Sequence, residues 1–482
     1  MVSPLPLVYL ALVLALCLHG LHRAVLVWTA WRFRSVGPPE GGLPDLLPLV
    51  TVQVPLYNER DVAPRLVEAV VALNWPPDRL QIQILDDSTD DTLVGCEAAL
   101  RLARQKGVAV EVLRRSRREG YKAGALQAGL ASARGELIAI FDADFVPAPD
   151  FLQRMVPSFT DPAVGMVQAR WGHLNEPASA LTRAQALMLD GHFVVEHTAR
   201  FRAGLWFHFN GTAGLWRRRC VEAAGGWSAD TLTEDLDLSY RAQLAGWKFV
   251  YRVEEVVPAE LPDSLSAFCT QQSRWARGSM QTLRKLLFPL LRSSAPLKNR
   301  VEAILHLCAN LAWPLGLGVA LLLPAVVGLP VQHHLIRVLV DGPAFVISTG
   351  ANILFYTVAR GGKWDPLAIL RVLLLGVGLS VNQSRAVLVG LLGGSGAFIR
   401  TPKRGDRAHS YGPELARLPL IELGLALWNL WGLGVAVMAS RWGAVPFLLL
   451  FSAGFSWVFW LGAREVRTAV GRPLRSAPAL GR

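Results

Sequence analysis

The chain has 482 residues, of which 52% are hydrophobic and 18% charged, and its mean hydropathy is +0.33. This composition is too apolar for a typical soluble protein and too charged for a protein made only of membrane spans, so it predicts a soluble domain joined to bilayer-spanning helices. Lys and Arg (49) exceed Asp and Glu (37), which favours anionic partners such as membrane lipids and sugar phosphates. The basic residues are scattered and no zinc spacing or RNA-binding motif accompanies them, so we expect no nucleic acid partner.

An apolar stretch opens the chain, and we expect residues 1–36 to form a transmembrane helix because the stretch is long enough to cross a bilayer. Arg32 and Arg34 lie at its end, and the positive-inside rule then places the N-terminus outside and the next region in the cytoplasm. Residues 37–46, rich in Gly and Pro, read as a linker.

Residues 47–285 alternate between short β-rich runs and helical segments. The β-rich runs are VTVQV (50–54), QIQIL (81–85), VAVEVL (108–113), ELIAIF (136–141) and VGMVQ (164–168). Alternating strands and helices predict a Rossmann-like α/β domain with a mostly parallel sheet. Ligands bind beyond the carboxyl ends of the strands in such sheets, and the polar motifs of this chain sit at those ends.

Apolar runs return after the α/β region, so residues 286–482 are expected to hold interfacial helices, about four transmembrane helices and a cytoplasmic loop at 396–416. The runs are 304–327, 338–358, 366–392, 418–438 and 445–461. That loop and the C-terminal tail are both strongly basic, and both are cytoplasmic only if 366–392 does not cross fully. This run carries internal arginines and amides, as a helix in the bilayer interface does. We therefore predict five crossings and one in-plane or re-entrant segment.

Two acidic pairs follow predicted strands. Asp142 and Asp144 come directly after LIAIF and point the same way, so they can hold a hard divalent cation; an ordinary acidic turn is the alternative. Asp86 and Asp87 end QIQIL, where carboxylates can bind a base or ribose, or cap the following helix.

The first strand ends in Pro55, Tyr57 and Glu59, where the tyrosine suits a nucleobase or simply forms a turn. Lys122 lies at the start of a predicted helix and suits phosphate, although such a lysine is more often solvated. The neighbouring basic run RRSRR (114–118) is interpreted as a solvated face.

Glu234 and Asp235 open a helix, where acids favour the helix dipole and where a carboxylate can serve as a general base. Arg274 and Trp275, in the segment QQSRWARG, suit a diphosphate and a sugar, or an amphipathic helix running toward the membrane.

His192 and Glu196 have the i, i+4 spacing of a metal site. The sequence offers no third ligand for them, so no metal is predicted there.

The order of these motifs is more specific than any one of them. PxYNE, DDS, GYKAG, DAD, TED and QxxRW occur once each, in that order, ahead of a predicted membrane bundle. This resembles glycosyltransferase family 2, in its cellulose synthase-like branch. LDDSTD, GYKAGAL, IAIFDADF, VQARW, FNGTAG and AGGW look most like the plant glucomannan synthases and their bacterial relatives.

The resemblance implies a GT-A fold in the cytoplasm and an inverting transfer that depends on Mg²⁺ or Mn²⁺. It assigns Asp235 as the catalytic base and Asp142 and Asp144 to the metal. The residues that it assigns to the nucleotide-diphosphate sugar donor are Pro55, Tyr57, Glu59, Asp86, Asp87, Lys122, Asp142 and Arg274. Those that it assigns to the acceptor are Asn210, Thr212, Glu234 and Trp275. Phe398, Thr401 and Lys403 fit the pattern FxxTxK of a gating loop.

Three functions stay open at this point. Processive synthesis of a polysaccharide from glucose or mannose donors is favoured by QxxRW together with FxxTxK. Transfer of a single sugar to a lipid acceptor, as in ceramide glucosyltransferases, is the alternative. A transporter with a nucleotide-binding domain is disfavoured because the acidic residues that ion coupling requires are sparse within the predicted spans. Asp341 and Glu422 are the main candidates. We expect an integral protein of the cell (inner) membrane with a cytoplasmic C-terminus; the donor, linkage and accessory subunits are not predicted.

Overall fold

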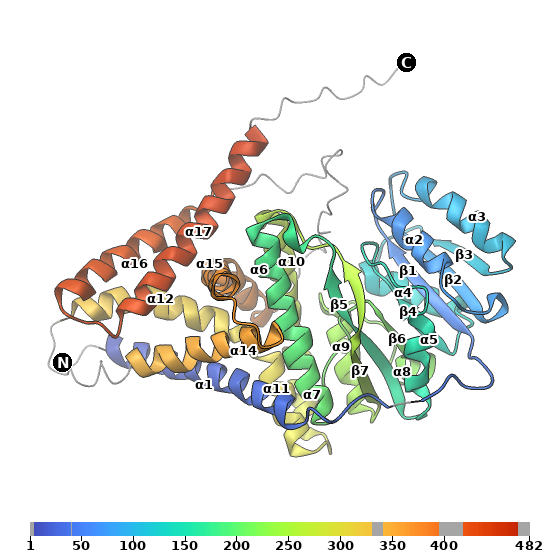
Figure 1. Ribbon diagram of the computed structural model, residues 1–482, viewed down its shortest axis with the longest axis horizontal. Helices are drawn as coiled ribbons and strands as arrows, with labels where there is room; N and C mark the ends of the chain where they lie inside the picture. Colours follow the sequence, from blue (N-terminus) through green and yellow to red (C-terminus); the bar gives the residue numbers. More distant parts are fainter. Residues whose placement is uncertain (1–3, 40, 330–340, 395–417, 471–482) are drawn as a thin grey trace.

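The computed structural model describes residues 4–39, 41–329, 341–394 and 418–470. An α/β domain forms one end of the molecule, and long helices from both ends of the chain gather at the other (Figure 1). The predicted division into a Rossmann-like domain and a helical bundle is confirmed.

A sheet runs through the α/β domain, in which the described strands have the order β3-β2-β1-β4-β6-β5-β7. The strands are β1 (Val50–Leu56), β2 (Leu80–Asp86), β3 (Ala109–Arg114), β4 (Leu137–Ile140), β5 (Val164–His173), β6 (Gly214–Arg217) and β7 (Lys248–Ala259). The β1–β2, β1–β4, β2–β3 and β5–β7 pairs are parallel, as predicted, and only the pairs of β6 are antiparallel among the described strands. β6 and β7 were not predicted, because β6 is short and β7 interleaves charged residues with apolar ones.

Helices cover both faces of this sheet. One face packs on α2 (Ala63–Val71), α3 (Glu97–Gln105) and α5 (Phe151–Met155), and the other on α4 (Tyr121–Ser132), α8 (Arg218–Ala223) and α9 (Glu234–Leu244). Because both faces are covered, β1 and β2 are buried along most of their length, as near-continuous apolar strands of parallel sheets are.

The strand register brings the polar motifs to one edge. Leu56 at the end of β1 lies beside Asp86 at the end of β2, and Gln53 of β1 lies beside Ile140 of β4. Because these three strands are parallel, the segments that follow each of them leave the sheet at the same edge.

Helices link the α/β domain to the bundle. They are α6 (Ala180–Asp190), a π-helical turn η5 (Gly191–His197), α7 (Thr198–Arg202), α10 (Leu265–Arg292) and α11 (Leu297–Leu307). The bundle contains α1 (Leu5–Arg32), α12 (Ala312–Gly328), π-helical η7 (Val346–Gly350) continuing into α14 (Ala351–Ala359), α15 (Pro366–Leu391), α16 (Leu420–Met438) and α17 (Val445–Val470). Position 285, the predicted end of the soluble domain, falls inside α10.

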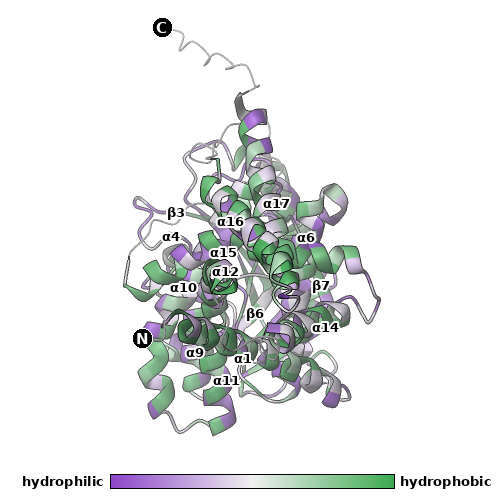
Figure 2. Ribbon diagram, turned by 90° about the vertical axis from the view of Figure 1, so that its left-hand side faces the viewer, coloured by the Kyte–Doolittle hydropathy of each residue, from purple (hydrophilic) through white to green (hydrophobic). Residues whose placement is uncertain are grey.

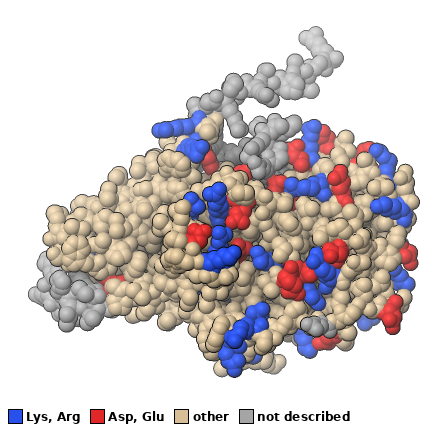
Figure 3. All heavy atoms as spheres, in the orientation of Figure 1, with Lys and Arg blue, Asp and Glu red and all other residues tan. Residues whose placement is uncertain are grey.

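Six helices within the described residues are long and apolar enough to cross a membrane. The bundle is strongly hydrophobic (Figure 2), and the face of it seen in Figure 3 carries few charged side chains, whereas the α/β domain is densely charged. This distribution is that of a protein with one end in a bilayer.

Helix α15 is oriented differently from its neighbours. Figure 1 shows α15 close to end-on, whereas α1, α12 and α16 run across the view. It packs mainly against α10 and α17. An axis turned away from the other helices is the arrangement that an in-plane or re-entrant segment requires. Phe398, Thr401 and Lys403, the predicted gating residues, lie outside the described residues.

Candidate active site

A cavity of about 160 Å³ opens where the motifs after β1, β2 and β4 meet α9 and α10. Twelve of the predicted site residues line it: Pro55, Tyr57, Glu59, Asp87, Lys122, Asp142, Asp144, Asn210, Glu234, Asp235, Arg274 and Trp275. Segments separated by more than 200 residues in sequence therefore meet around one space.

Lys122 lies in the first turn of α4, as predicted, and its ammonium sits between two acidic motifs. Its Nζ is 2.6 Å from Asp142 Oδ1 and donates a 2.9 Å hydrogen bond to the Gly211 carbonyl. Burial alone would lower the pKa of this ammonium, but Asp142, Glu234 and Asp235 raise it above its usual value. Lys122 is therefore a fixed positive charge beside the carboxylates.

Thr212 holds Asp142 in place rather than lining the cavity. It is fully buried, and its Oγ1 accepts a 2.9 Å hydrogen bond from the Asp142 backbone N–H. Asp142 and Asp144 both face the cavity, Asp144 with only 3% of its surface exposed. Two such carboxylate side chains are oxygen donors that fit a hard divalent cation.

Asp235 is part-buried in the first turn of α9, and its Oδ1 accepts a 2.8 Å hydrogen bond from the Leu236 N–H. Burial and the neighbouring Glu234 raise the pKa of Asp235 to about 7, against the opposing effect of Lys122 and Arg274. A carboxylate with a pKa near the ambient pH has the property required of a general base.

Gly211 allows the loop after Asn210 to pass directly under Asp235. Its φ is +82°, and a Cβ added there would lie 2.9 Å from Asp235 Oδ2. A side chain at this position would therefore be strained and would occupy the space in front of the carboxylate.

Arg274 and Trp275 come from α10, which packs closely on the start of α9: a Cβ at Gly278 would lie 2.5 Å from the Thr233 side chain. Burial lowers the pKa of Arg274, although Glu234 and Asp142 act in the opposite direction. The Trp275 ring lies 6.3 Å from Trp171 of β5, centroid to centroid. Trp171 was not predicted.

The basic run 114–118 is a solvated face only in part: Arg114 and Arg117 are exposed, but Arg115 and Arg118 are partly buried, so that interpretation was wrong for these two residues. The Arg118 guanidinium lies 3.3 Å from the centroid of the Tyr57 ring and lines the cavity, and Arg115 forms an ion pair with Asp87. β2 and β3 are parallel neighbours, so the acids after β2 meet the arginines after β3.

The structure does not place Asp86 on the cavity. Its side chain is buried, pairs with Arg114 at 2.8 Å and accepts a 3.1 Å hydrogen bond from the Ser88 N–H. These contacts stabilise the turn after β2, and Asp87 is the residue of this pair that faces the cavity.

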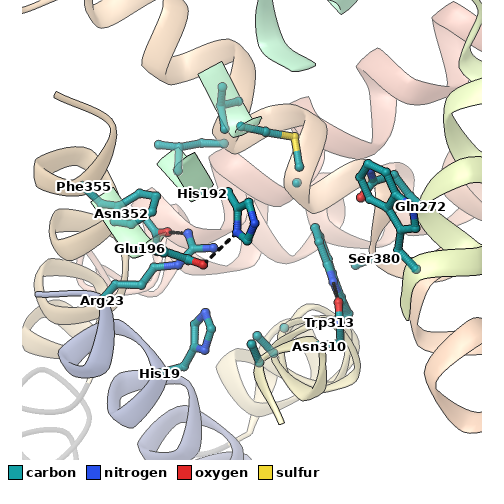
Figure 4. Close-up of a pocket in the computed structure, with 18 of the residues that line it drawn as sticks. His19, Arg23, His192, Glu196, Gln272, Asn310, Trp313, Asn352, Phe355 and Ser380 are labelled. Atoms are coloured by element: carbon teal, nitrogen blue, oxygen red, sulfur yellow. Dashed lines mark hydrogen bonds and ion pairs between the residues drawn. The ribbon is translucent and has the colours of Figure 1, made fainter. Parts of the chain in front are cut away.

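A second cavity, of about 440 Å³, adjoins the first and extends among the bundle helices. Asn210, Asp235, Gln271 and Trp275 are among the residues that line both cavities. Its far walls come from α1, α12, α14, α15 and α17, and Figure 4 shows polar side chains such as Arg23, Asn352 and Ser380 facing it.

Residues 48–278 match the family model described as Glycosyltransferase like family 2. The chain is 44% identical over 269 residues to probable glucomannan 4-beta-mannosyltransferase 7 of Oryza sativa subsp. japonica, covering 54% of this chain and 46% of that protein. It is 44% identical over 251 residues to glucomannan 4-beta-mannosyltransferase 2 of Arabidopsis thaliana, covering 51% and 47%. The chain thus spans about half the length of these curated relatives.

A solved mannosyltransferase from Pyrobaculum calidifontis, in complex with GDP-Man and Mn²⁺, has a similar fold: the TM-score is 0.55 at 23% identity, over 80% of this chain and 99% of that one. All the residues that line the smaller cavity fall within the matched segment. Residues 48–278 therefore form a domain of the GT-A fold that matches the family described as Glycosyltransferase like family 2.

Proposed function

We propose that the chain is an inverting, metal-dependent β-glycosyltransferase that takes a hexose from a nucleotide-diphosphate sugar. The observation that supports this best is the composition of one cavity. It combines a carboxylate whose pKa is about 7, Asp235, with the paired acids Asp142 and Asp144 and the cations Lys122 and Arg274.

The chemistry is a single in-line displacement. Asp235 accepts the proton of the acceptor hydroxyl as that oxygen attacks the anomeric carbon, and the bond to the diphosphate breaks on the opposite face. Lys122 and Arg274 stabilise the negative charge of the departing diphosphate. Asp142 and Asp144 would hold a divalent cation, which would supply further charge neutralisation at the diphosphate. One base suffices because a diphosphate leaves without a general acid. Because the displacement is in line, it inverts the anomeric carbon, and an α-linked donor gives a β-linked product.

GDP-mannose is the first donor to test, because the curated relatives are named mannosyltransferases and the solved neighbour holds GDP-Man. The detergent-purified chain is incubated separately with labelled GDP-mannose, GDP-glucose, UDP-glucose and UDP-N-acetylglucosamine, and the products are sized. Transfer from none of the four would overturn the proposal.

We further propose that the acceptor is a growing polysaccharide. The larger cavity supports this, because it begins at Asp235 and Trp275 and continues among the membrane helices, where an elongating product can be retained between additions. Products of many residues are expected on sizing. A single sugar on an extractable lipid would instead establish the alternative, transfer to a lipid acceptor.

Transfer should depend on pH through Asp235. The base must be ionised to accept a proton, and its pKa is raised to about 7. We expect kcat/KM to fall about tenfold per pH unit below that value and to level off above it. Glu234→Gln removes one of the causes of the raised pKa and should move this limb to lower pH. A profile that is flat from about pH 5 to 8 would contradict the assignment.

Arg118 is expected to contribute to donor binding by stacking on Tyr57 beside Asp87. Arg118→Ala removes a guanidinium that lines the cavity and holds the Tyr57 ring in place. Because that cation–π contact is worth ~1 kcal/mol, its loss should weaken nucleotide binding by up to about fivefold, measured by titration calorimetry. Arg114→Ala is the matched control, since Arg114 pairs with Asp86 away from the cavity and should leave affinity unchanged. Equal losses in both variants would exclude a direct role for Arg118.

The membrane topology that we propose has five crossings, with α15 in the plane of the membrane or re-entrant, the N-terminus outside and both the α/β domain and the C-terminus in the cytoplasm. The orientation of α15 among its neighbours supports this (Figure 1). A reporter fused after Leu392 should then score cytoplasmic, and an extracytoplasmic signal there would overturn the topology.

A further inference from the structure

Three histidines meet behind the acceptor side of the active site. His192 and His197 belong to η5, and His208 lies two residues before Asn210. One ring nitrogen from each of the three lies within 4.8 Å of the others. Their rings are close, with centroids 4.3 Å apart for His192–His197 and 5.0 Å apart for His197–His208.

The π-helical turn explains how two of these residues share a face. Residues five apart on an α-helix point in different directions, because the turn holds 3.6 residues. The wider turn of η5 brings His197 next to His192. The i, i+4 pair predicted from sequence, His192 and Glu196, is present too, but Glu196 lies on the outer side of the His192 ring.

The outer hydrogen bonds fix which ring nitrogens are free of protons. His192 Nδ1 is 3.2 Å from Glu196 Oε2, so it carries the N–H and leaves Nε2 as a lone pair. His197 Nε2 is 2.9 Å from the carbonyl oxygen of His208, so it donates there and leaves Nδ1 bare. A carboxylate or a backbone carbonyl on the outer nitrogen is the arrangement that orients histidine ligands in metal sites (Figure 4 labels His192 and Glu196).

The bare nitrogen of His197 is buried. His197 is fully buried and its Nδ1 makes no hydrogen bond. A buried polar nitrogen without a partner costs free energy of about 1–3 kcal/mol, which a bound cation would offset.

Asn210 offers a further oxygen. Its Nδ2 lies 2.9 Å from His192 Nε2 and 3.1 Å from His208 Nε2, while its buried Oδ1 makes no hydrogen bond. In the absence of an ion, Nδ2 donates to the lone pairs of both rings. When an ion takes those lone pairs, rotation of the amide by half a turn keeps its shape and turns Oδ1 toward the ion.

The charges around the cluster are balanced. Arg200 pairs with Glu196 at 3.3 Å and with Glu302 at 2.9 Å, and Arg23 donates to Asn352. The two carboxylates offset the two guanidinium groups, so the three neutral imidazoles face no excess of positive charge.

We propose that His192, His197 and His208 bind one borderline transition-metal ion, with Zn²⁺ as the best match to three imidazoles, and that it is separate from the hard-cation site at Asp142 and Asp144. Zinc requires its nitrogen ligands about 3.3 Å apart, so the ring nitrogens must approach one another by up to about 1.5 Å. The ion would tie the loop that carries Asn210 to η5 and so position the acceptor wall of the cavity. The site does not depend on the proposed glycosyltransferase activity.

Zinc retention by the full chain tests this. The protein, purified in detergent and stripped by dialysis against a chelator, is given ZnCl₂ with excess MgCl₂ and passed through gel filtration before elemental analysis. Magnesium occupies carboxylate sites but does not displace zinc from imidazole. We expect about one zinc per chain.

Variants locate the bound ion. His197→Gln and His208→Gln should each lose most of the zinc, whereas Asp142→Asn/Asp144→Asn should retain it. His306→Gln is the matched control, because His306 stacks on His208 but bonds to Tyr240 and lies outside the trio. Failure of the unmodified chain to retain zinc would overturn the proposal, as would zinc lost with the aspartates and kept without the histidines.

One measurement needs no variant. Zinc-edge X-ray absorption of the loaded wild-type chain should show imidazole nitrogens at about 2.0 Å. A shell of oxygen atoms alone would refute the site even if the histidine variants fail to fold.

Discussion

Asp235→Asn should abolish sugar transfer while leaving nucleotide binding almost unchanged. Asparagine has the shape of aspartate but cannot accept the proton of the acceptor hydroxyl, and loss of a general base costs on the order of 10²–10⁴-fold in rate. The Leu236 N–H still has an oxygen to bond, so α9 should keep its start. Turnover is measured with labelled donor and nucleotide affinity by titration calorimetry.

Asp230→Asn is the control for this variant. Asp230 lies in the loop just before α9, is largely exposed and pairs with Lys285 at 3.1 Å, outside the cavity. Its substitution should leave turnover intact. Undiminished turnover in Asp235→Asn would refute the base, and parallel loss of nucleotide binding would show that Asp235 acts in binding instead.

Removal of the hard-cation site should be equally severe. Asp142→Asn and Asp144→Asn each take away a charged oxygen donor, and a metal's stabilisation of a departing diphosphate amounts to several kcal/mol. Because 1.36 kcal/mol is tenfold in rate, we expect losses on the order of 10²–10³-fold. A chelator should silence the unmodified enzyme, and added Mn²⁺ or Mg²⁺ should restore it.

The pKa of Lys122 gives this prediction a second readout. Without the Asp142 carboxylate, Lys122 loses its 2.6 Å partner and one of the groups that raise its pKa, so the pKa of Lys122 should be lower in Asp142→Asn than in the unmodified chain. Asp150→Asn is the control, since Asp150 pairs with Arg154 outside the cavity. Full activity in the presence of a chelator would remove the metal from the mechanism.

The location of the site was predictable from sequence because it depends on strand order more than on side-chain packing. Parallel strands must end at one edge, so the residues after β1, β2 and β4 had to meet. The residues that α9 and α10 add to the site were predicted from the order of the motifs along the chain. Asp235 and Arg274 lie far from Asp142 in sequence, yet all three line the same cavity.

The errors arose where neighbours in space decide a side chain's role. Arg118 looks solvated until β3 is placed beside β2, and only then does it lie over Tyr57. Asp86 and Asp87 are adjacent residues of one type, and the alternation along the strand sends one to Arg114 and the other to the cavity.

The histidine cluster could not have been found by spacing rules. Those rules assume an α-helical repeat, and η5 departs from it between Gly191 and His197. His208 joins the cluster from a separate loop.

The first helix of the chain does more than hold the domain at a bilayer. Leu16, His19 and Arg23 of α1 form part of the wall of the larger cavity, and His22 reaches Glu302 of α11 at 2.9 Å. Removing α1 by cutting the chain at the linker would thus leave the larger cavity beside Asp235 open along one side. Biochemical work on this protein therefore needs α1 present, because a truncated chain would lack the part of the cavity wall that α1 provides.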